Sequence, residues 1–152
     1  MRRFGALILV AAVCLLTGAR DVPQPPSGSI AVSISSWGHP ISVWTIDKRG
    51  HVARRTSTLQ RRTEVRATSF KVGARGYARI RALLAPARRH AGKTLSCTDR
   101  ITDQPYGSVI WHEPRGPAEL RFDYGCRDAE TRAIVERLMA ADGQIRQWDE
   151  RK

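Results

Sequence analysis

The sequence predicts an α+β domain in which an antiparallel sheet built from hairpins carries two helices packed on one face. Short segments of alternating or β-branched residues follow one another with turn residues between them, which is typical of hairpin strands. Two segments repeat their apolar residues at helical spacing, one in the middle of the chain and one at its end. Because runs of adjacent strands are separated by single helices, antiparallel pairing is favoured over parallel βαβ winding.

The first half of the predicted sheet consists of strands joined by short loops. Apolar residues alternate with small ones over Ile30–Ile34, and β-branched and aromatic residues fill Ile41–Ile46. Asp47–Gly50 has the composition of a hairpin loop with its glycine in the αL conformation, and it leads into a strand over His51–Thr56. A further strand is expected within Thr63–Lys71. The hairpin around Asp47–Gly50 is the clearest local feature of the chain.

A helix is predicted after this first group of strands. From Ala74, apolar residues fall at helical spacing, and Pro86 is expected to stop or kink the helix. The apolar positions are Tyr77, Ile80, Leu83 and Leu84. The arginines of this segment are expected on its solvent-facing side.

The second half of the chain repeats the order of strands and then a helix. Strands are expected over Tyr106–His112 and Glu119–Tyr124, joined by turn residues between them. Asp128 is a suitable N-cap for a final helix, which Gly143 weakens. The apolar stripe of that helix is Ile134, Leu138, Ala141, Ile145 and Trp148.

The N-terminus predicts a cleavable signal peptide over residues 1–19. A positive start is followed by an apolar run over Phe4–Leu16 and by small residues up to Ala19. That run is too short to cross a bilayer as a helix, although an uncleaved anchor is the alternative interpretation. Residues 20–28 contain three prolines and read as a flexible leader. The protein is therefore expected in the periplasm or the medium, with one domain over residues 29–152 and no membrane span in the mature chain.

Two cysteines remain after the predicted cleavage, Cys97 and Cys126. An even number of cysteines in an exported protein predicts a disulfide, and two allow a single connectivity. Two free thiols are the alternative. The bridge would close a loop of about 30 residues and stabilise the fold by about 3 to 4 kcal/mol in the chain-entropy model.

The positive charge is concentrated in the middle of the chain. Loss of Arg2 and Arg3 with the signal peptide lowers the net charge from +12 to +10. Lys48 to Lys93 contains fourteen basic residues and one acidic residue, whereas the rest of the chain after Lys93 is close to neutral. Such a segment is typical of a surface for polyanions, but an Arg-rich composition also follows from a GC-rich genome. The candidate anion-binding residues are Arg54, Arg55, Arg61, Arg62 and Arg66, because Arg forks suit phosphate and carboxylate groups.

No motif in the sequence specifies a reaction. The four histidines are widely spaced, and the chain has no Cys-x-x-Cys, so no metal site and no cofactor are predicted. His39 and His112 form the pair that would serve an acid–base hydrolase or nuclease if the fold brought them together. The Arg-rich segment lacks interleaved aromatic residues and any known nucleic-acid module, so specific nucleic-acid recognition is not predicted.

The layout of the chain resembles small exported bacterial proteins of unknown function. The resemblance rests on the strand and loop over Ile41–Gly50, a helix near Tyr77–Leu84, the segments Cys97–Asp99 and Tyr124–Cys126, and a final helix. It covers most of the mature chain and implies export, the disulfide and the α+β class. It implies no activity.

The expectation from the sequence is a non-catalytic envelope protein that binds an anionic partner through an Arg-rich face. The candidate partners are an anionic polysaccharide, a lipid head group and an acidic protein. The alternatives are a small secreted hydrolase or nuclease, and a protein inhibitor. The sequence leaves the catalytic residues and the oligomeric state open.

Overall fold

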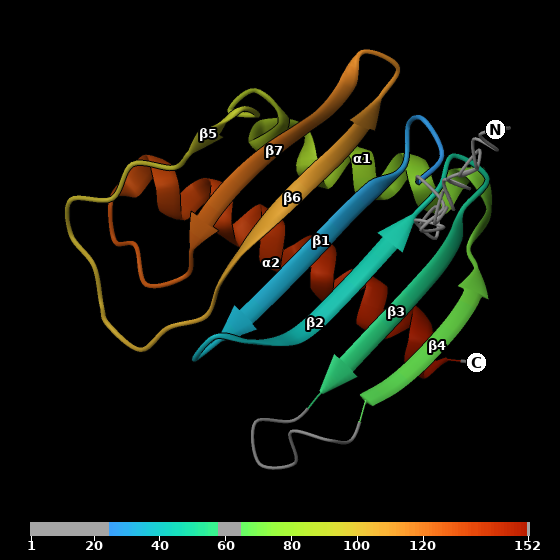
Figure 1. The fold of residues 1–152 in the computed structure, drawn as a ribbon, viewed down its shortest axis with the longest axis horizontal. Coiled ribbons are helices and arrows are strands. Elements are labelled where there is room, and N and C mark those ends of the chain that lie inside the picture. Colours follow the sequence, from blue (N-terminus) through green and yellow to red (C-terminus); the bar gives the residue numbers. More distant parts are fainter. Residues whose placement is uncertain (1–24, 58–64, 152) are drawn as a thin grey trace, which may run out of the picture.

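The computed structural model describes residues 25–57 and 65–151, which form one seven-stranded sheet with two helices (Figure 1). The strand order is β4-β3-β2-β1-β6-β7-β5, and every pair is antiparallel except the short β5–β7 pair. Both helices lie on the same side of the sheet, behind it in Figure 1. The bounds are β1 Ile30–Ser36, β2 His39–Ile46, β3 His51–Ser57, β4 Val65–Lys71, α1 Gly73–Arg88, β5 Lys93–Thr94, β6 Tyr106–Glu113, β7 Gly116–Asp123 and α2 Ala129–Glu150. The predicted fold class is confirmed.

The contacts of the β2–β3 hairpin explain why its loop could be predicted from the sequence. Asp47 accepts hydrogen bonds from the backbone N–H groups of Arg49 and His51 through its carboxylate. Gly50 has a φ of +76°, and a Cβ there would lie 2.1 Å from the carbonyl oxygen of Gly73. The loop therefore needs glycine both for its conformation and for its contact with the start of α1.

One face of the sheet forms the core. Inward side chains alternate along the central strands with half-exposed residues on the open face. The buried set comprises Ile30, Val32, Ile34, Trp44, Ile46, Val52, Val109, Trp111, Leu120 and Phe122 from the sheet, with Ile80, Leu84, Ala87, Ile134, Val135, Leu138, Ala141 and Ile145 from the helices. Both predicted apolar helix stripes thus face the sheet.

Helix α1 does not stop at Pro86. It continues to Arg88, because Ala87 is buried against the core and holds the last turn in place. The proline removes the hydrogen bond to the carbonyl of Ala82, but Ala82 is exposed, so water can bind that oxygen.

Helix α2 begins after Asp128, as predicted, but Asp128 does not cap it through its side chain. The carboxylate instead accepts hydrogen bonds from the N–H and hydroxyl of Thr98, at 2.7 and 2.9 Å, and from the N–H of Asp99 at 3.3 Å. The expected cap is therefore replaced by a clamp on the loop that follows β5.

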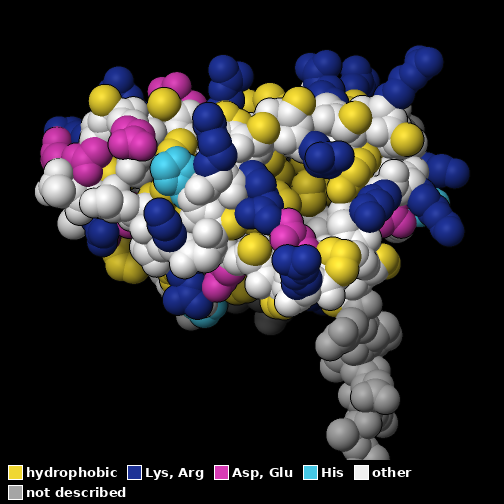
Figure 2. All heavy atoms as spheres, turned by 90° about the horizontal axis from the view of Figure 1, so that it is seen from above, with side chains coloured by type: hydrophobic (Ala, Val, Ile, Leu, Met, Phe, Trp, Pro, Cys, Tyr) yellow, Lys and Arg dark blue, Asp and Glu magenta, His cyan; other side chains and the backbone are white. Residues whose placement is uncertain are grey.

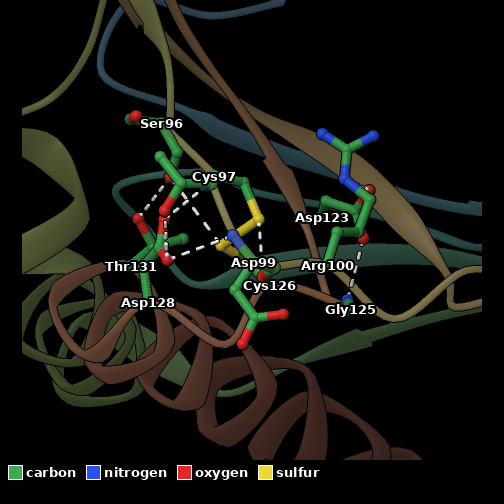
Figure 3. Close-up of polar contacts among 10 residues, drawn as sticks. Ser96, Cys97, Asp99, Arg100, Asp123, Gly125, Cys126, Asp128 and Thr131 are labelled. Carbon is green, nitrogen blue, oxygen red and sulfur yellow. Dashed lines mark hydrogen bonds and ion pairs between the residues drawn. A yellow bond between two sulfur atoms is a disulfide. The ribbon is translucent and has the colours of Figure 1, made fainter.

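The Cys97–Cys126 disulfide lies beside this clamp and confirms the predicted bridge (Figure 3). Thr131 of α2 donates a hydrogen bond to the carbonyl of Ser96 at 2.7 Å, and the backbone of Arg100 pairs with that of Cys126. The covalent and polar contacts together fix the long β5–β6 loop to the start of α2.

Two carboxylates of α2 contact polar side chains on the inner face of the sheet. Asp142 accepts hydrogen bonds from the indole N–H of Trp44 at 3.0 Å and the hydroxyl of Ser42 at 3.1 Å. Asp149 accepts one from the guanidinium of Arg54 at 2.8 Å. These contacts connect α2 to β2 and β3.

The predicted signal peptide and most of the predicted leader lie outside the described residues. Backbone contacts with the domain begin slightly before the predicted start at Ser29, since the N–H of Gly28 donates to the carbonyl of His112. In the described part of the chain, neither helix has the length and apolar content that crossing a membrane requires.

Candidate anion-binding site

The candidate anion-binding arginines within the described residues do not all lie on one face of the sheet. Arg54 and Arg55 are consecutive residues of β3, so their side chains point to opposite faces of the sheet. Arg66 is exposed on β4, opposite Thr56 in the register. Arg61 and Arg62 lie outside the described residues. Arg54 and Arg55 therefore do not form one Arg-rich face.

The Arg54 side chain is largely buried and already forms an ion pair. Its side chain is 12% exposed, and it forms an ion pair with Asp149, whose side chain is 3% exposed. An arginine that is already paired and largely removed from water has little capacity for an external anion. Arg54 is better explained as a structural residue than as a ligand-binding one.

A different set of cations lines an open groove of about 670 Å³ where the first turns of α1 meet the last turns of α2. We call it the basic groove and define it by the exposed cations Lys71, Arg75, Arg79 and Arg151 together with Trp148. The amides of Gln144 and Gln147 complete its polar lining. The described residues that line the groove include no Asp or Glu.

Local helix geometry creates this arrangement. The buried stripe of α1 runs through Gly76 and Ile80, and Arg75 and Arg79 flank it one turn apart on the side of α2. A Cβ at Gly76 would lie 2.4 Å from the side chain of Val72 and 3.5 Å from the ring of Trp148. Glycine at this position therefore leaves room for the Val72 side chain, and a Cβ there would make only an ordinary contact with α2.

The electrostatics of the basic groove favour an anion. None of its four cations forms an ion pair with an acidic residue in the described ranges. The first turn of α1 contains no acidic residue, so the positive end of the helix dipole adds to Lys71 and Arg75. Lys and Arg side chains dominate the end of the molecule on the right of Figure 2, whereas Asp and Glu gather mainly toward the left.

A second cleft, of about 450 Å³, lies on the other flank of α1. Glu113 in its lining partly neutralises the positive charge of the cleft. Arg88 pairs with Glu113 and stacks on Trp111, with its Cζ 5.4 Å from the ring centroid. Arg81 lies over the ring of Tyr77 at 5.8 Å. Burial raises the pKa of Tyr77, and Arg81 partly opposes this, so the phenol stays protonated and donates to the carbonyl of Gly28. Because the Arg88 guanidinium already has a partner, this cleft offers an anion less than the basic groove does.

His39 and His112 do not converge. His39 is paired with Ser36 at one end of β1, and the N–H of His112 binds the carbonyl of Ser29 at the other end. Seven residues of extended strand separate these points by about 23 Å. His51 forms a contact with Asp47 at 2.9 Å and is exposed. The acid–base pair that a hydrolase or nuclease would need is not assembled from His39 and His112.

One group of potential metal ligands lies within the described residues, namely Cys97, Cys126 and Asp128. The two sulfur atoms are bonded to each other, and the carboxylate accepts hydrogen bonds from Thr98 and Asp99. Thiolates are the zinc-binding form of cysteine, so a disulfide is unsuited to hold the ion.

The sequence contained one local signal for the basic groove, the spacing of Arg75 and Arg79. It assigned these residues only to a solvent-facing side of the helix, and nothing in the local pattern linked them to Arg151 and Trp148, more than 60 residues later. Comparison of the chain with protein-family models, curated proteins and solved structures finds no match.

Proposed function

We propose that this chain is a non-catalytic exported protein that binds an anionic partner through the basic groove. The observation that carries the proposal is the convergence of Lys71, Arg75, Arg79 and Arg151 on one open groove whose described lining contains no acidic residue. An anionic polysaccharide, a lipid head group and an acidic protein all present the carboxylate or phosphate groups that such cations bind.

The shape of the groove favours an extended ligand that lies along the surface. The groove opens where the two helices meet, and its cations come from the end of β4, the first turns of α1 and the C-cap of α2. Gln144 and Gln147 add amide donors and acceptors, and the ring of Trp148 adds an apolar surface. A polymer with repeated negative groups would satisfy several cations at once.

The experiment compares two triple charge reversals of the mature protein. In the first, Arg75, Arg79 and Arg151 are changed to Glu; in the second, the exposed residues Arg115, Arg127 and Arg137 are changed to Glu. Both variants have the same net charge. We expect the groove variant to bind polygalacturonate roughly tenfold or more weakly than the control variant, which corresponds to about 1.4 kcal/mol.

Salt dependence provides the second measurement. Because each neutralised charge on a polyanion releases counterions, the affinity of the wild type should fall steeply with salt. The groove variant should show a flatter slope than the control variant. Vesicles containing phosphatidylglycerol, tested in parallel, distinguish a lipid surface from a polysaccharide. Equal loss in the two variants for every probe would mean that only net charge matters and would contradict the proposal.

A further inference from the structure

The tip of the β1–β2 hairpin carries an exposed tryptophan in an unfavourable backbone conformation. Trp37 has a φ of +51°, Gly38 has a φ of +76°, and Ser36 pairs with His39 across them. A two-residue loop with positive φ at both positions is a type I′ turn, for which Asn-Gly is the preferred sequence. Trp37 therefore occupies a position where Asn would fit better.

Core packing does not compensate for this conformation, since the Trp37 side chain is 69% exposed. Exposed tryptophan in the αL region costs backbone energy and also leaves a large apolar surface in water. A residue of this kind at a rigid loop tip indicates contact with something outside the chain.

Two further apolar side chains lie at the same place. Tyr106 is 44% exposed and Ile101 is 43% exposed, and both line a small cleft with Trp37. Tyr106 starts β6 and pairs with Ser35, so its position relative to the hairpin tip is fixed by the sheet. We call the surface formed by Trp37, Ile101 and Tyr106 the aromatic platform.

The loop that supplies Ile101 is held in place before any ligand arrives (Figure 3). The N–H of Ile101 donates to the carbonyl of Gly125 at 2.9 Å, and Arg100 pairs with Asp123 at 3.4 Å. The Cys97–Cys126 disulfide closes the same region. A pre-ordered surface loses little conformational entropy on binding.

The polar groups around the aromatic platform indicate the chemistry of the ligand. The cleft of about 280 Å³ is also lined by Arg100, Gln104, Asp103 and Asp123, which supply both donors and acceptors. Arg100 is paired with Asp123, so the cleft has no excess of positive charge for phosphate or an anionic lipid. Three exposed apolar residues are few for a protein interface, which covers about 800 Å² on each partner.

We infer that the aromatic platform binds a neutral saccharide. A pyranose ring has an apolar C–H face that can lie on an aromatic ring, whose face is electron-rich, and a rim of hydroxyl groups that both donate and accept hydrogen bonds. The cleft is slightly smaller than the pockets of about 300–1,000 Å³ that enclose whole small molecules, so one sugar ring would sit on the platform while the rest of the chain extends outside.

The test measures binding of three neutral hexasaccharides, cellohexaose, maltohexaose and N-acetylchitohexaose, by titration calorimetry. Trp37→Asn removes the aromatic ring and leaves the preferred Asn-Gly turn, so the variant should be at least as resistant to denaturant as the wild type. We expect it to bind at least one hexasaccharide roughly tenfold more weakly. Tyr106→Thr should also weaken binding, and Met139→Gln, which removes an exposed apolar side chain from α2, should not.

The affinity should be insensitive to salt and unchanged by the triple reversal in the basic groove, so this inference stands or fails separately from the proposed function. The inference would be overturned if the wild type bound none of the three sugars at millimolar concentration. Binding to phosphatidylcholine vesicles that is lost with Trp37→Asn would also overturn it, because the platform would then contact a membrane surface.

Discussion

At the scale of single residues, Arg54 and Asp149 show how a buried ion pair differs from a binding site. Both side chains are largely removed from water, and each charge is stabilised by the other. The attraction between them mainly offsets the cost of burial. Removal of Arg54 takes a cation away from a carboxylate that is 3% exposed, which is more costly than loss of a surface contact.

Arg54→Gln should therefore lower the free energy of unfolding by about 3 kcal/mol. Arg55→Gln is the matched control, since Arg55 is the next residue of β3 and is exposed on the opposite face. Its effect should stay within about 0.5 kcal/mol. Urea denaturation of the two variants measures the difference. Similar urea midpoints for the two variants would contradict the expected contribution of the Arg54–Asp149 pair to stability.

Asp128 predicts a local pH dependence. Hydrogen bonds from the backbone and the hydroxyl of Thr98 hold the pKa of this carboxyl below its ordinary value of 3.8. A carboxyl with a depressed folded pKa stabilises the native state above its unfolded pKa, and this contribution is lost as the pH falls through the folded value. The clamp on the β5–β6 loop should therefore weaken only below about pH 4.

The measurement is an NMR titration of the Thr98 amide, whose chemical shift should follow the protonation of Asp128 with a midpoint below pH 3.8. Asp128→Asn should abolish this titration while the amide of Arg49, which binds Asp47, continues to respond to acid. A midpoint above pH 4 in the wild type would contradict the assigned hydrogen bonds.

At the scale of elements, α2 contains one glycine that its packing does not require. Gly143 lies in the interior of the helix, and a Cβ there would approach only the side chain of Arg146, at 3.9 Å. Gly143→Ala should raise the free energy of unfolding by about 0.5 to 1 kcal/mol, because alanine loses less backbone entropy in a helix.

The contrasting variant is Gly50→Ala, which places a Cβ against the backbone of Gly73 in a residue with positive φ. It should destabilise the protein. Thermal unfolding of both variants measures the two effects. A destabilising Gly143→Ala would mean that the end of α2 is packed more tightly than its surroundings indicate.

Local patterns predicted the elements well because turns and alternation are local properties. Asp47–Gly50 formed the expected loop, and the strands and both helices lie within a few residues of their predicted positions. Local patterns did not predict the partner of Asp128, since Thr98 is 30 residues away, or the two-residue strand β5, which forms only through its pairing with β7. Pro86 was expected to stop or kink the helix, and the first of these alternatives did not account for the buried Ala87 beyond it.

Because sequence patterns are local, they predicted only part of the candidate site. Charge density along the chain located the basic segment, and Lys71, Arg75 and Arg79 lie inside it. Whether two neighbouring arginines share a surface depends on the element that carries them. On β3 they alternate between faces, whereas residues one turn apart on α1 lie on the same side. Arg151 joins them only because α2 ends beside the start of α1.

At the scale of the whole molecule, the two proposed surfaces are spatially separate. The tip of the β1–β2 hairpin and the C-terminal end of α2 lie toward opposite ends of the molecule in Figure 1. A polysaccharide with both acidic and neutral sugar units would therefore be able to contact both, the groove through charge and the platform through an aromatic ring. Avidity would then exceed either affinity without any new contact.

The disulfide connects stability to the compartment that the N-terminus predicts. It links Cys97, after β5, to Cys126, just before α2, across a sequence separation of 29 residues. In the chain-entropy model, closing a loop of that length stabilises the fold by about 3 to 4 kcal/mol. This is a large part of the total stability of a small domain, so the protein should depend on an oxidising environment.

The test uses mature protein recovered from the periplasm or the medium, which we predict begins near Arg20. Unfolded without reductant, it should contain no free thiol. Reduction, or the double change Cys97→Ser and Cys126→Ser, should lower the free energy of unfolding by about 3 to 4 kcal/mol. Because Asp128 and Thr131 still hold the same loop, the reduced protein should unfold at lower urea with a similar dependence on urea concentration, rather than lose its fold entirely. Two reactive thiols in the recovered protein would contradict the prediction of oxidation, and an unchanged urea midpoint after reduction would contradict the stabilising role of the bridge.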